Sequence, residues 1–261
     1  PVAGSYRAID FALSNMSNSH IQRVAVLTQY NARSLNEHLS SSKWWDFGRK
    51  QGGLYIFTPT ITAANSSWYR GTADAIYQNL DWLKKSHEPY VVIASGDAVY
   101  KMDYNKVLEY HIDQKADITV VCKDMPAGTD VSRFGVLRTD EDGRILDFEE
   151  KPVETSGSTI SCGIYVIRRR QLIELIEKCA QEDRYDFVRD ILIRYKNLKR
   201  IFAYRITDYW NSISSVESYY ETNMDFLKAD VRKYFFTTYP DVYSKLLDLP
   251  QANYTQGADV K

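Results

Sequence analysis

The chain has 261 residues, of which 44% are apolar and 26% charged, a composition typical of a globular protein with a sizeable core. Its formal net charge of −1 gives no bulk attraction for nucleic acid or for an anionic membrane, and we expect neither as a partner. The three cysteines lack C-x-x-C spacing, which argues against a disulfide framework or a zinc site and favours a reducing, cytoplasmic environment. No apolar run approaches the roughly 20 residues of a membrane helix, so we expect no membrane span.

Short apolar runs alternate with helical patterns along the first half of the chain. Strands are predicted at 23–28, 90–95 and 118–122, and helices at 72–85 and 104–114. This β-α-β-α-β order indicates an α/β fold with a mainly parallel, right-handed wound sheet. Continuous apolar runs are typical of strands that are covered on both faces.

The second half begins with a β-rich patch. "FGVLRT" and "ILDFEE" flank Asp142-Gly143, a turn signal that predicts a hairpin. Further strands are predicted at 160–167 and about 201–206, and helices at about 169–180, 185–196 and 216–230. Beyond about residue 236 the pattern weakens into short apolar pieces, prolines and a polar end. We therefore predict one domain over 1–235 and a linker over 236–261, for which a loosely held C-terminus is the alternative.

Three segments lie where an open α/β sheet binds ligands, outside the carboxyl ends of its strands. Gln29 follows the strand at 23–28, and Asp97 follows the strand at 90–95. "WYRGTADA" (68–75) opens a helix with small residues, and free N–H groups at a helix start suit an anionic ligand. Composition alone, however, favours plain helix capping by Gly71-Thr72.

Asp97 by itself is weak evidence for a metal site, because acids in turns after strands are common. A magnesium ion is usually held by one or two carboxylates together with substrate phosphates, so the question is whether a second carboxylate exists. Lys151 in "EEKP" (149–152) could hold a phosphate as a point charge. A solvated charged turn closed by Pro152 is the simpler interpretation of that segment.

Six longer segments occur in a fixed order. They are "GSYRAIDFALSNMSNSHIQRVAVLTQY", "WYRGTADAIYQNLDWL", "SGDAVYKMDY", "FGVLRTDEDGRILDFEEKP", "CGIYVIRRRQL" and "YETNMDFL". In order and approximate spacing they resemble the bacterial ADP-glucose pyrophosphorylases (glucose-1-phosphate adenylyltransferases) over almost all of residues 1–261. The resemblance implies a Rossmann-like, GT-A-like nucleotidyltransferase domain with a mixed sheet. In the family a left-handed β-helix domain follows, and we expect it to be absent from this chain.

The resemblance also implies an activity and roles for single residues. The family makes ADP-glucose and pyrophosphate from ATP and glucose 1-phosphate with magnesium, for glycogen or starch synthesis. By position, Asp97 would be the first metal-holding aspartate, and Lys151 would contact the sugar phosphate. The nucleotide side would be lined by Gln29, Tyr69, Gly71, Thr72 and Ala73, and the sugar phosphate by Gly135, Glu150, Lys151, Ser161 and Tyr165. The reaction would be in-line attack of a sugar-phosphate oxygen on the α-phosphate of ATP, promoted mostly by positioning and charge neutralisation.

Three departures from the family pattern bear on activity. The chain starts at Pro1, downstream of the family's glycine-rich triphosphate loop, and Ala98 replaces a histidine that is common in active members. In "DYWNSISSVESYY" (208–220), Ser212 stands where the family's "YW-x-D-V-G-T" block has its second metal aspartate, and Ser214 replaces the glycine. Magnesium binding would therefore be weak or absent. Asp208, four residues upstream, is not expected to substitute.

This pattern resembles the diverged D-type subunit of glycogen biosynthesis, which occurs beside a catalytic subunit in some Gram-positive bacteria. It implies a regulatory or weakly active subunit of a hetero- or homo-oligomer, a tetramer, that assembles with the catalytic subunit. Trp44, Trp45 and Trp68 are candidates for the associating surface. Two alternatives stay open: a self-sufficient magnesium enzyme that uses Asp97 and another ligand, and a related transferase for a different sugar or nucleotide.

Overall fold

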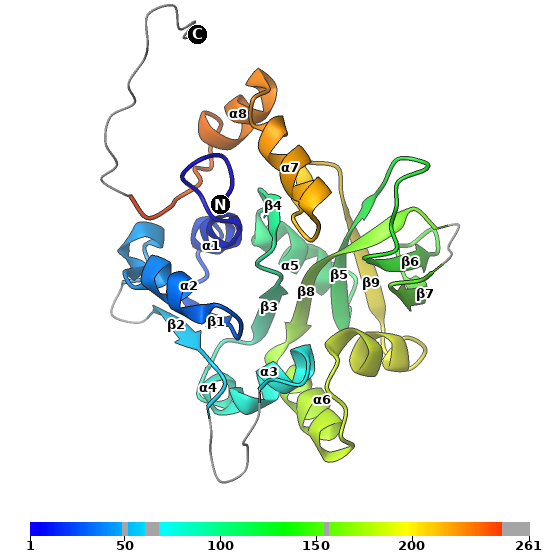
Figure 1. The fold of residues 1–261 in the computed structure, drawn as a ribbon. Coiled ribbons are helices and arrows are strands. Elements are labelled where there is room, and N and C mark those ends of the chain that lie inside the picture. Colours follow the sequence, from blue (N-terminus) through cyan, green and yellow to red (C-terminus); the bar gives the residue numbers. More distant parts are fainter. Residues whose placement is uncertain (49–51, 61–67, 154–156, 247–261) are drawn as a thin grey trace, which may run out of the picture.

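The computed structural model describes residues 1–48, 52–60, 68–153 and 157–246 (Figure 1). Its main sheet has six strands in the order β7-β6-β8-β5-β9, with β3 paired to β8. The strands are β3 (Tyr90–Ala94), β5 (Ile118–Asp124), β6 (Gly135–Thr139), β7 (Ile145–Glu150), β8 (Thr159–Arg168) and β9 (Ile201–Ile206). The α/β class predicted from the sequence is confirmed.

The sheet is mixed rather than mainly parallel. Only β5 and β9 pair in parallel within it, whereas β8 pairs antiparallel with β3, β5 and β6, and β6 pairs antiparallel with β7. The strands β3 and β5 point the same way, as the wound pattern requires, but the ten-residue β8 lies between them. The prediction of a mainly parallel sheet is therefore wrong, because a later strand takes the central position.

Two smaller sheets lie beside the main one. The strand β1 (Arg23–Leu27) pairs in parallel with β2 (Gly53–Phe57), and β4 (Ala98–Tyr100) pairs antiparallel with β10 (Trp210–Ser212). A cavity of about 740 Å³ separates β1 from β3 and is lined mainly by apolar side chains of these strands and of α1. None of the predicted site residues lines this cavity. The polar candidate site therefore lies elsewhere.

The helices are α1 (Ala8–Asn18), α2 (Ala32–Leu39), α3 (Thr72–Gln78), α4 (Leu80–Lys84), α5 (Tyr104–Asp113), α6 (Arg169–Gln181), α7 (Val216–Asp225) and α8 (Ala229–Phe236). Of these, α5 packs on one face of the main sheet and α6 on the other. The segments Ser42–Trp45 and Val188–Ile193 form a 3₁₀ turn and a π-helical stretch. The helix predicted over 72–85 is two short helices that meet at Asn79. No helix among the described residues is long and apolar enough to cross a membrane.

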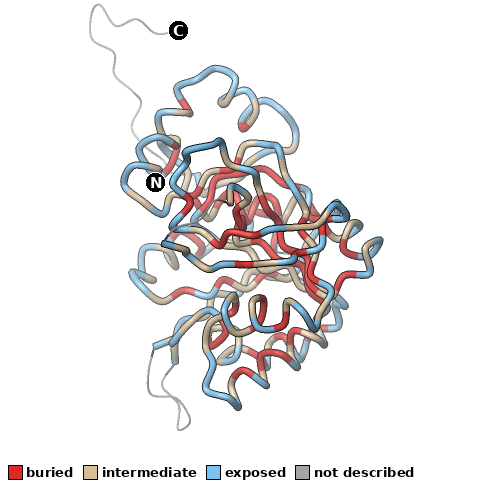
Figure 2. Tube along the Cα trace, turned by 90° about the vertical axis from the view of Figure 1, so that its right-hand side faces the viewer, coloured by how far each residue is buried: buried red, intermediate tan, exposed pale blue. Residues whose placement is uncertain are grey.

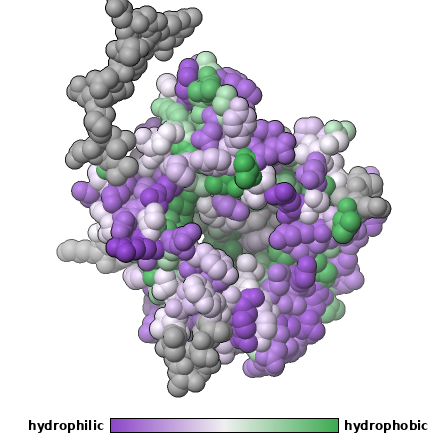
Figure 3. Space-filling model, viewed as in Figure 1, coloured by the Kyte–Doolittle hydropathy of each residue, from purple (hydrophilic) through white to green (hydrophobic). Residues whose placement is uncertain are grey.

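Alternate side chains of β8 enter two separate cores. Ile164 and Val166 pack on the side of α5, and Tyr165 and Ile167 pack on the side of α6. Figure 2 shows buried residues concentrated along the central strands. In Figure 3 the surface over α6 is mostly hydrophilic, while apolar side chains gather around a central hollow. Trp45 is 0% exposed, so its proposed place on an associating surface is wrong, whereas Trp68 is exposed.

The C-terminal part of the described chain is held against the N-terminal part. The helix α8 ends at Phe236, close to the predicted domain boundary at 235. Residues 237–246 contain no helix or strand, yet the backbone of Tyr243 is hydrogen-bonded to Ser14 of α1. The first part of the predicted linker is therefore docked on the domain, and residues 247–261 lie outside the described residues.

Candidate active site

Asp97 lies at the carboxyl end of β3, directly before β4. Its carboxylate accepts a hydrogen bond from the hydroxyl of Ser95, and its side chain is exposed. Its carbonyl oxygen accepts a hydrogen bond of 2.8 Å from the backbone N–H of Ile213. In the β4–β10 ladder Ser212 is the direct partner of Ala98. The register thus places Ile213 opposite Asp97, and Ser212 opposite the residue that follows Asp97.

The same ladder shows whether Asp208 could act as a second metal ligand in place of the residue at position 212. It runs from the Ser212–Ala98 pair to the Trp210–Tyr100 pair, so Asp208 lies beyond the end that is further from Asp97. No group of three or more His, Cys, Asp or Glu residues within the described ranges could hold a metal ion. Among the described residues, the group hydrogen-bonded to the Asp97 carboxylate is the neutral hydroxyl of Ser95. This pair fits a hard dication such as magnesium poorly, because such ions prefer several charged oxygen ligands.

The predicted sugar-phosphate residues meet where β6, β7 and β8 lie side by side. Gly135 of β6 is the ladder partner of Glu150, and the Nζ of Lys151 lies 3.8 Å from the Glu150 carboxylate. On β8 the hydroxyls of Ser161 and Tyr165 are 3.5 Å apart. A Cβ atom at Gly135 would lie 2.6 Å from the Phe148 ring and 3.1 Å from Glu150, so only glycine fits there.

The electrostatics of this group suit a phosphorylated polyol. Burial raises the pKa of Glu150, an effect that Asp186 reinforces and Lys151 opposes. Burial also raises the pKa of Tyr165 to about 12, so its hydroxyl stays neutral and can donate a hydrogen bond. The Lys151 side chain is 61% exposed and lies at the surface, where its ammonium group can meet an anion.

The strand β8 joins this group to Asp97. The backbone N–H of Ser95 donates to the carbonyl oxygen of Gly163 at 3.0 Å, and the N–H of Gly163 lies 3.3 Å from the Ser161 hydroxyl. Gly163 has a φ of +68°, and a Cβ atom there would lie 3.2 Å from the Cβ of Ser95. The close approach of the two strands therefore depends on glycine. Backbone contacts thus connect the turn that holds Asp97 with the part of β8 that holds Ser161.

On the predicted nucleotide side, Gln29 and Tyr69 are in direct contact. The Gln29 side chain accepts a hydrogen bond of 2.6 Å from the backbone N–H of Tyr69, whose hydroxyl accepts one of 3.0 Å from Asn79. Beside them Tyr30 and Trp68 stack with their ring centres 5.5 Å apart, and both rings are exposed. An exposed aromatic face thus lies next to Gln29, which is compatible with a planar ligand.

The start of α3 is less open than its sequence suggests. The N–H groups of Ala73 and Asp74 donate to the Tyr185 carbonyl at 2.8 and 3.3 Å, and the Thr72 hydroxyl accepts from the N–H of Phe187. A Cβ atom at Gly71 would lie 2.4 Å from the same carbonyl. The expectation of free N–H groups is therefore wrong at Ala73. That Gly71, Thr72 and Ala73 line a nucleotide stays a prediction.

The sequence analysis missed three residues that shape the site. Ser95 was within reach, because it lies in the same turn as Asp97. Gly163 was also visible, since an isolated glycine in a strand marks a close backbone approach. Tyr185 gave no local signal, because its carbonyl acts on a helix far away in the sequence.

Comparisons with known proteins agree with this geometry. A family model described as nucleotidyl transferase matches residues 1–229. The glucose-1-phosphate adenylyltransferase of Thermotoga maritima is 42% identical over 233 residues, which cover 86% of this chain and 54% of the relative. That of Clostridium acetobutylicum is 39% identical, and the match covers 100% of this chain and 69% of the relative. That of Lachnospira eligens is 40% identical, and the match covers 95% of this chain and 58% of the relative. The chain spans little more than half the length of most of these relatives. It belongs to the nucleotidyl transferase family, among the relatives of the glucose-1-phosphate adenylyltransferases.

Proposed function

We propose that the chain is part of a glucose-1-phosphate adenylyltransferase subunit that is regulatory or only weakly active by itself. The overall reaction would convert ATP and glucose 1-phosphate into ADP-glucose and pyrophosphate in glycogen biosynthesis. The names of the relatives support the reaction. The observation that supports the regulatory role is Ser212, a neutral residue that is the ladder partner of Ala98, the residue after Asp97.

The residues on the sugar side have defined tasks in this proposal. The ammonium group of Lys151 would hold the phosphate of glucose 1-phosphate, and the hydroxyls of Ser161 and Tyr165 would donate to sugar oxygens. The Glu150 carboxylate would accept from a sugar hydroxyl. Together they would orient the phosphate oxygen for in-line attack on the α-phosphate of ATP. Magnesium, when bound, would supply charge neutralisation on the triphosphate.

The metal side explains why turnover would be weak. The transition state of phosphoryl transfer develops negative charge that must be neutralised. A hydroxyl in place of the second carboxylate weakens the hold on the cation that does this. Loss of one such electrostatic contributor is worth roughly 3–4 kcal/mol, or about 100- to 1000-fold in rate. A subunit with this defect would contribute mainly by assembling with a catalytic subunit and tuning its activity, in a hetero-oligomer.

A self-sufficient enzyme is the second candidate function. It needs Asp97 and a ligand outside the pair discussed above, and the exposure of the Asp97 carboxylate leaves room for one. A transferase for another sugar has less support, because the relatives named above all carry glucose 1-phosphate in their names.

The test is pyrophosphate release from ATP and glucose 1-phosphate with magnesium, using the natural polypeptide that contains these residues. It should be assayed alone, mixed with a catalytic adenylyltransferase subunit, and as the Ser212→Asp variant. The proposal predicts little activity alone, stimulation of the partner, and a gain in the variant. Robust activity alone that Asp97→Asn abolishes would instead establish the self-sufficient enzyme.

A further inference from the structure

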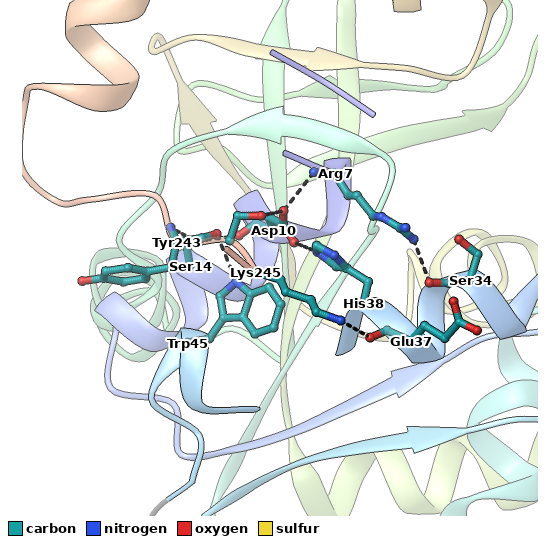
Figure 4. Close-up of polar contacts among 10 residues, drawn as sticks. Arg7, Asp10, Ser14, Ser34, Glu37, His38, Trp45, Tyr243 and Lys245 are labelled. Carbon is teal, nitrogen blue, oxygen red and sulfur yellow. Dashed lines mark hydrogen bonds and ion pairs between the residues drawn. The ribbon is translucent and has the colours of Figure 1, made fainter. Parts of the chain in front are cut away.

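Asp10 of α1 is a carboxylate that is 0% exposed and fully hydrogen-bonded (Figure 4). One oxygen accepts from the backbone N–H of Arg7 at 2.9 Å and from the hydroxyl of Ser244 at 2.6 Å. The other lies 2.6 Å from the Nε2 atom of His38 in α2. A buried carboxylate is stable only with such partners. One of them, Ser244, comes from 234 residues further along the chain.

Ser244 belongs to a segment, residues 241–245, that we name the strap. The backbone N–H of Tyr243 donates to the Ser14 hydroxyl at 2.8 Å, and its carbonyl accepts from the indole of Trp45 at 3.2 Å. The Lys245 ammonium group donates to the Glu37 carbonyl at 2.9 Å. Figure 4 shows the strap crossing α1 beside α2 and the Ser42–Trp45 turn. Asp10 is the one buried carboxylate in this contact among the described residues.

The opposite side of α1 holds β4. The amide side chain of Asn15, 1% exposed, donates to the Tyr100 carbonyl and accepts from the Met102 N–H, both at 3.1 Å. Ala12 of the same helix packs in one core with Ala98 and Tyr100. The strand β4 begins with Ala98, the residue after Asp97. Because packed elements shift as units, a displacement of α1 moves β4.

We propose that Asp10 is a positioning residue that keeps the strap docked on α1, and that the docked strap fixes β4 and with it the backbone at Asp97. The order of contacts is strap, Asp10, α1, Asn15, β4. A displacement of the strap would thereby be transmitted to the candidate site, although the strap itself contacts no ligand there. The inference concerns backbone positions and holds whether or not Asp97 binds a metal.

A purely local role for Asp10 gives a different expectation. Asp10 also accepts from the Arg7 N–H at the start of α1, as a helix-capping acid does. Ser244→Ala separates the two roles, because it removes the strap's bond and leaves the bond to Arg7 intact. Thr159→Val is a matched control: its hydroxyl also donates to a carboxylate, that of Asp124 at 2.6 Å, in the β5–β8 ladder and not in the strap.

The experiment is hydrogen–deuterium exchange on the natural polypeptide, followed peptide by peptide. In Ser244→Ala, amides of the strap and of residues 98–102 should exchange about tenfold faster, the change expected when one hydrogen bond to a charged group is lost. Ser244→Thr restores the hydroxyl and should restore slow exchange in both regions, and Thr159→Val should alter neither. Unchanged exchange at 98–102 beside a released strap would overturn the proposal, as would a strap that Ser244→Ala does not loosen.

Discussion

Ser212→Asp is the substitution that tests the metal side most directly. Ser212 is 5% exposed and is the ladder partner of Ala98, the residue after Asp97. A new carboxylate there is shielded from water. Without a cation we expect the free energy of unfolding to fall by about 2–3 kcal/mol, the usual cost of a poorly compensated buried polar group.

Magnesium should reverse this loss. Two carboxylates at the end of β3 and β10 give a hard cation the minimal protein ligands that it needs. A ligand that binds only the folded state adds about 2.7 kcal/mol of stability at 100 times its dissociation constant. The variant should therefore be less stable than the natural protein without magnesium and recover with millimolar magnesium. Urea unfolding at several magnesium concentrations measures both effects.

The control is Ser214→Asp, which adds the same charge at an exposed position two residues further on. Its stability should stay within about 0.5 kcal/mol of the natural protein and should respond to magnesium no more than the natural protein does. If magnesium stabilises Ser212→Asp no more than this control, the positions 97 and 212 do not converge on a cation. The explanation of weak turnover through Ser212 would then be refuted.

Three other perturbations follow from the structure. Burial lowers the pKa of His111 to about 4 from 6.5, so the unfolded chain takes up a proton first as the pH falls. The unfolding free energy should thus drop by about 3 kcal/mol as the pH falls from 6.5 to 4. Urea unfolding at several pH values measures this drop, and His111→Asn should remove it. Gly71→Ala places a methyl group 2.4 Å from the Tyr185 carbonyl and should cost about 1–3 kcal/mol in thermal unfolding. Gly48→Ala, where the nearest atom is the Ser42 hydroxyl at 3.9 Å, should cost less than about 1 kcal/mol. Lys151→Gln should weaken glucose 1-phosphate binding by about 10- to 100-fold in calorimetry, and unchanged affinity would remove Lys151 from the site.

The strands that the sequence placed well are those with continuous apolar runs and polar ends. The strand β3 (Tyr90–Ala94) lies within one residue of its prediction, because Pro89 and the Ser95-Gly96 turn delimit it on both sides. The hairpin of β6 and β7 forms around Gly143, whose φ of +84° explains why a glycine follows Asp142 there. In these two cases the turn residues alone were sufficient to predict where the strands begin and end.

The pairing of strands that are distant in the sequence could not be predicted from local sequence patterns. The residues of "ISCGIYVI" do not by themselves indicate that this strand lies between β3 and β5. Its position depends on pairing with strands that are distant in the sequence. The strands β4 and β10 have three residues each, and each forms only because it pairs with the other. The start of α3 carries the residues of an open anion site, yet the carbonyl of Tyr185 occupies it.

Under the proposed function, the candidate site would keep the shape of its sugar side while lacking one of two metal-binding carboxylates. Gly135 and Gly163 are held to glycine by Phe148 and Ser95, so the backbone around Glu150 and the Ser161 hydroxyl keeps a close-packed form. These constraints act on the sugar side and do not depend on the residue at position 212. Under the proposed function, binding of glucose 1-phosphate and turnover would therefore be separable. A subunit that binds the sugar phosphate through Lys151 but cannot complete the metal site would sense substrate without consuming it, the behaviour that a regulatory subunit requires.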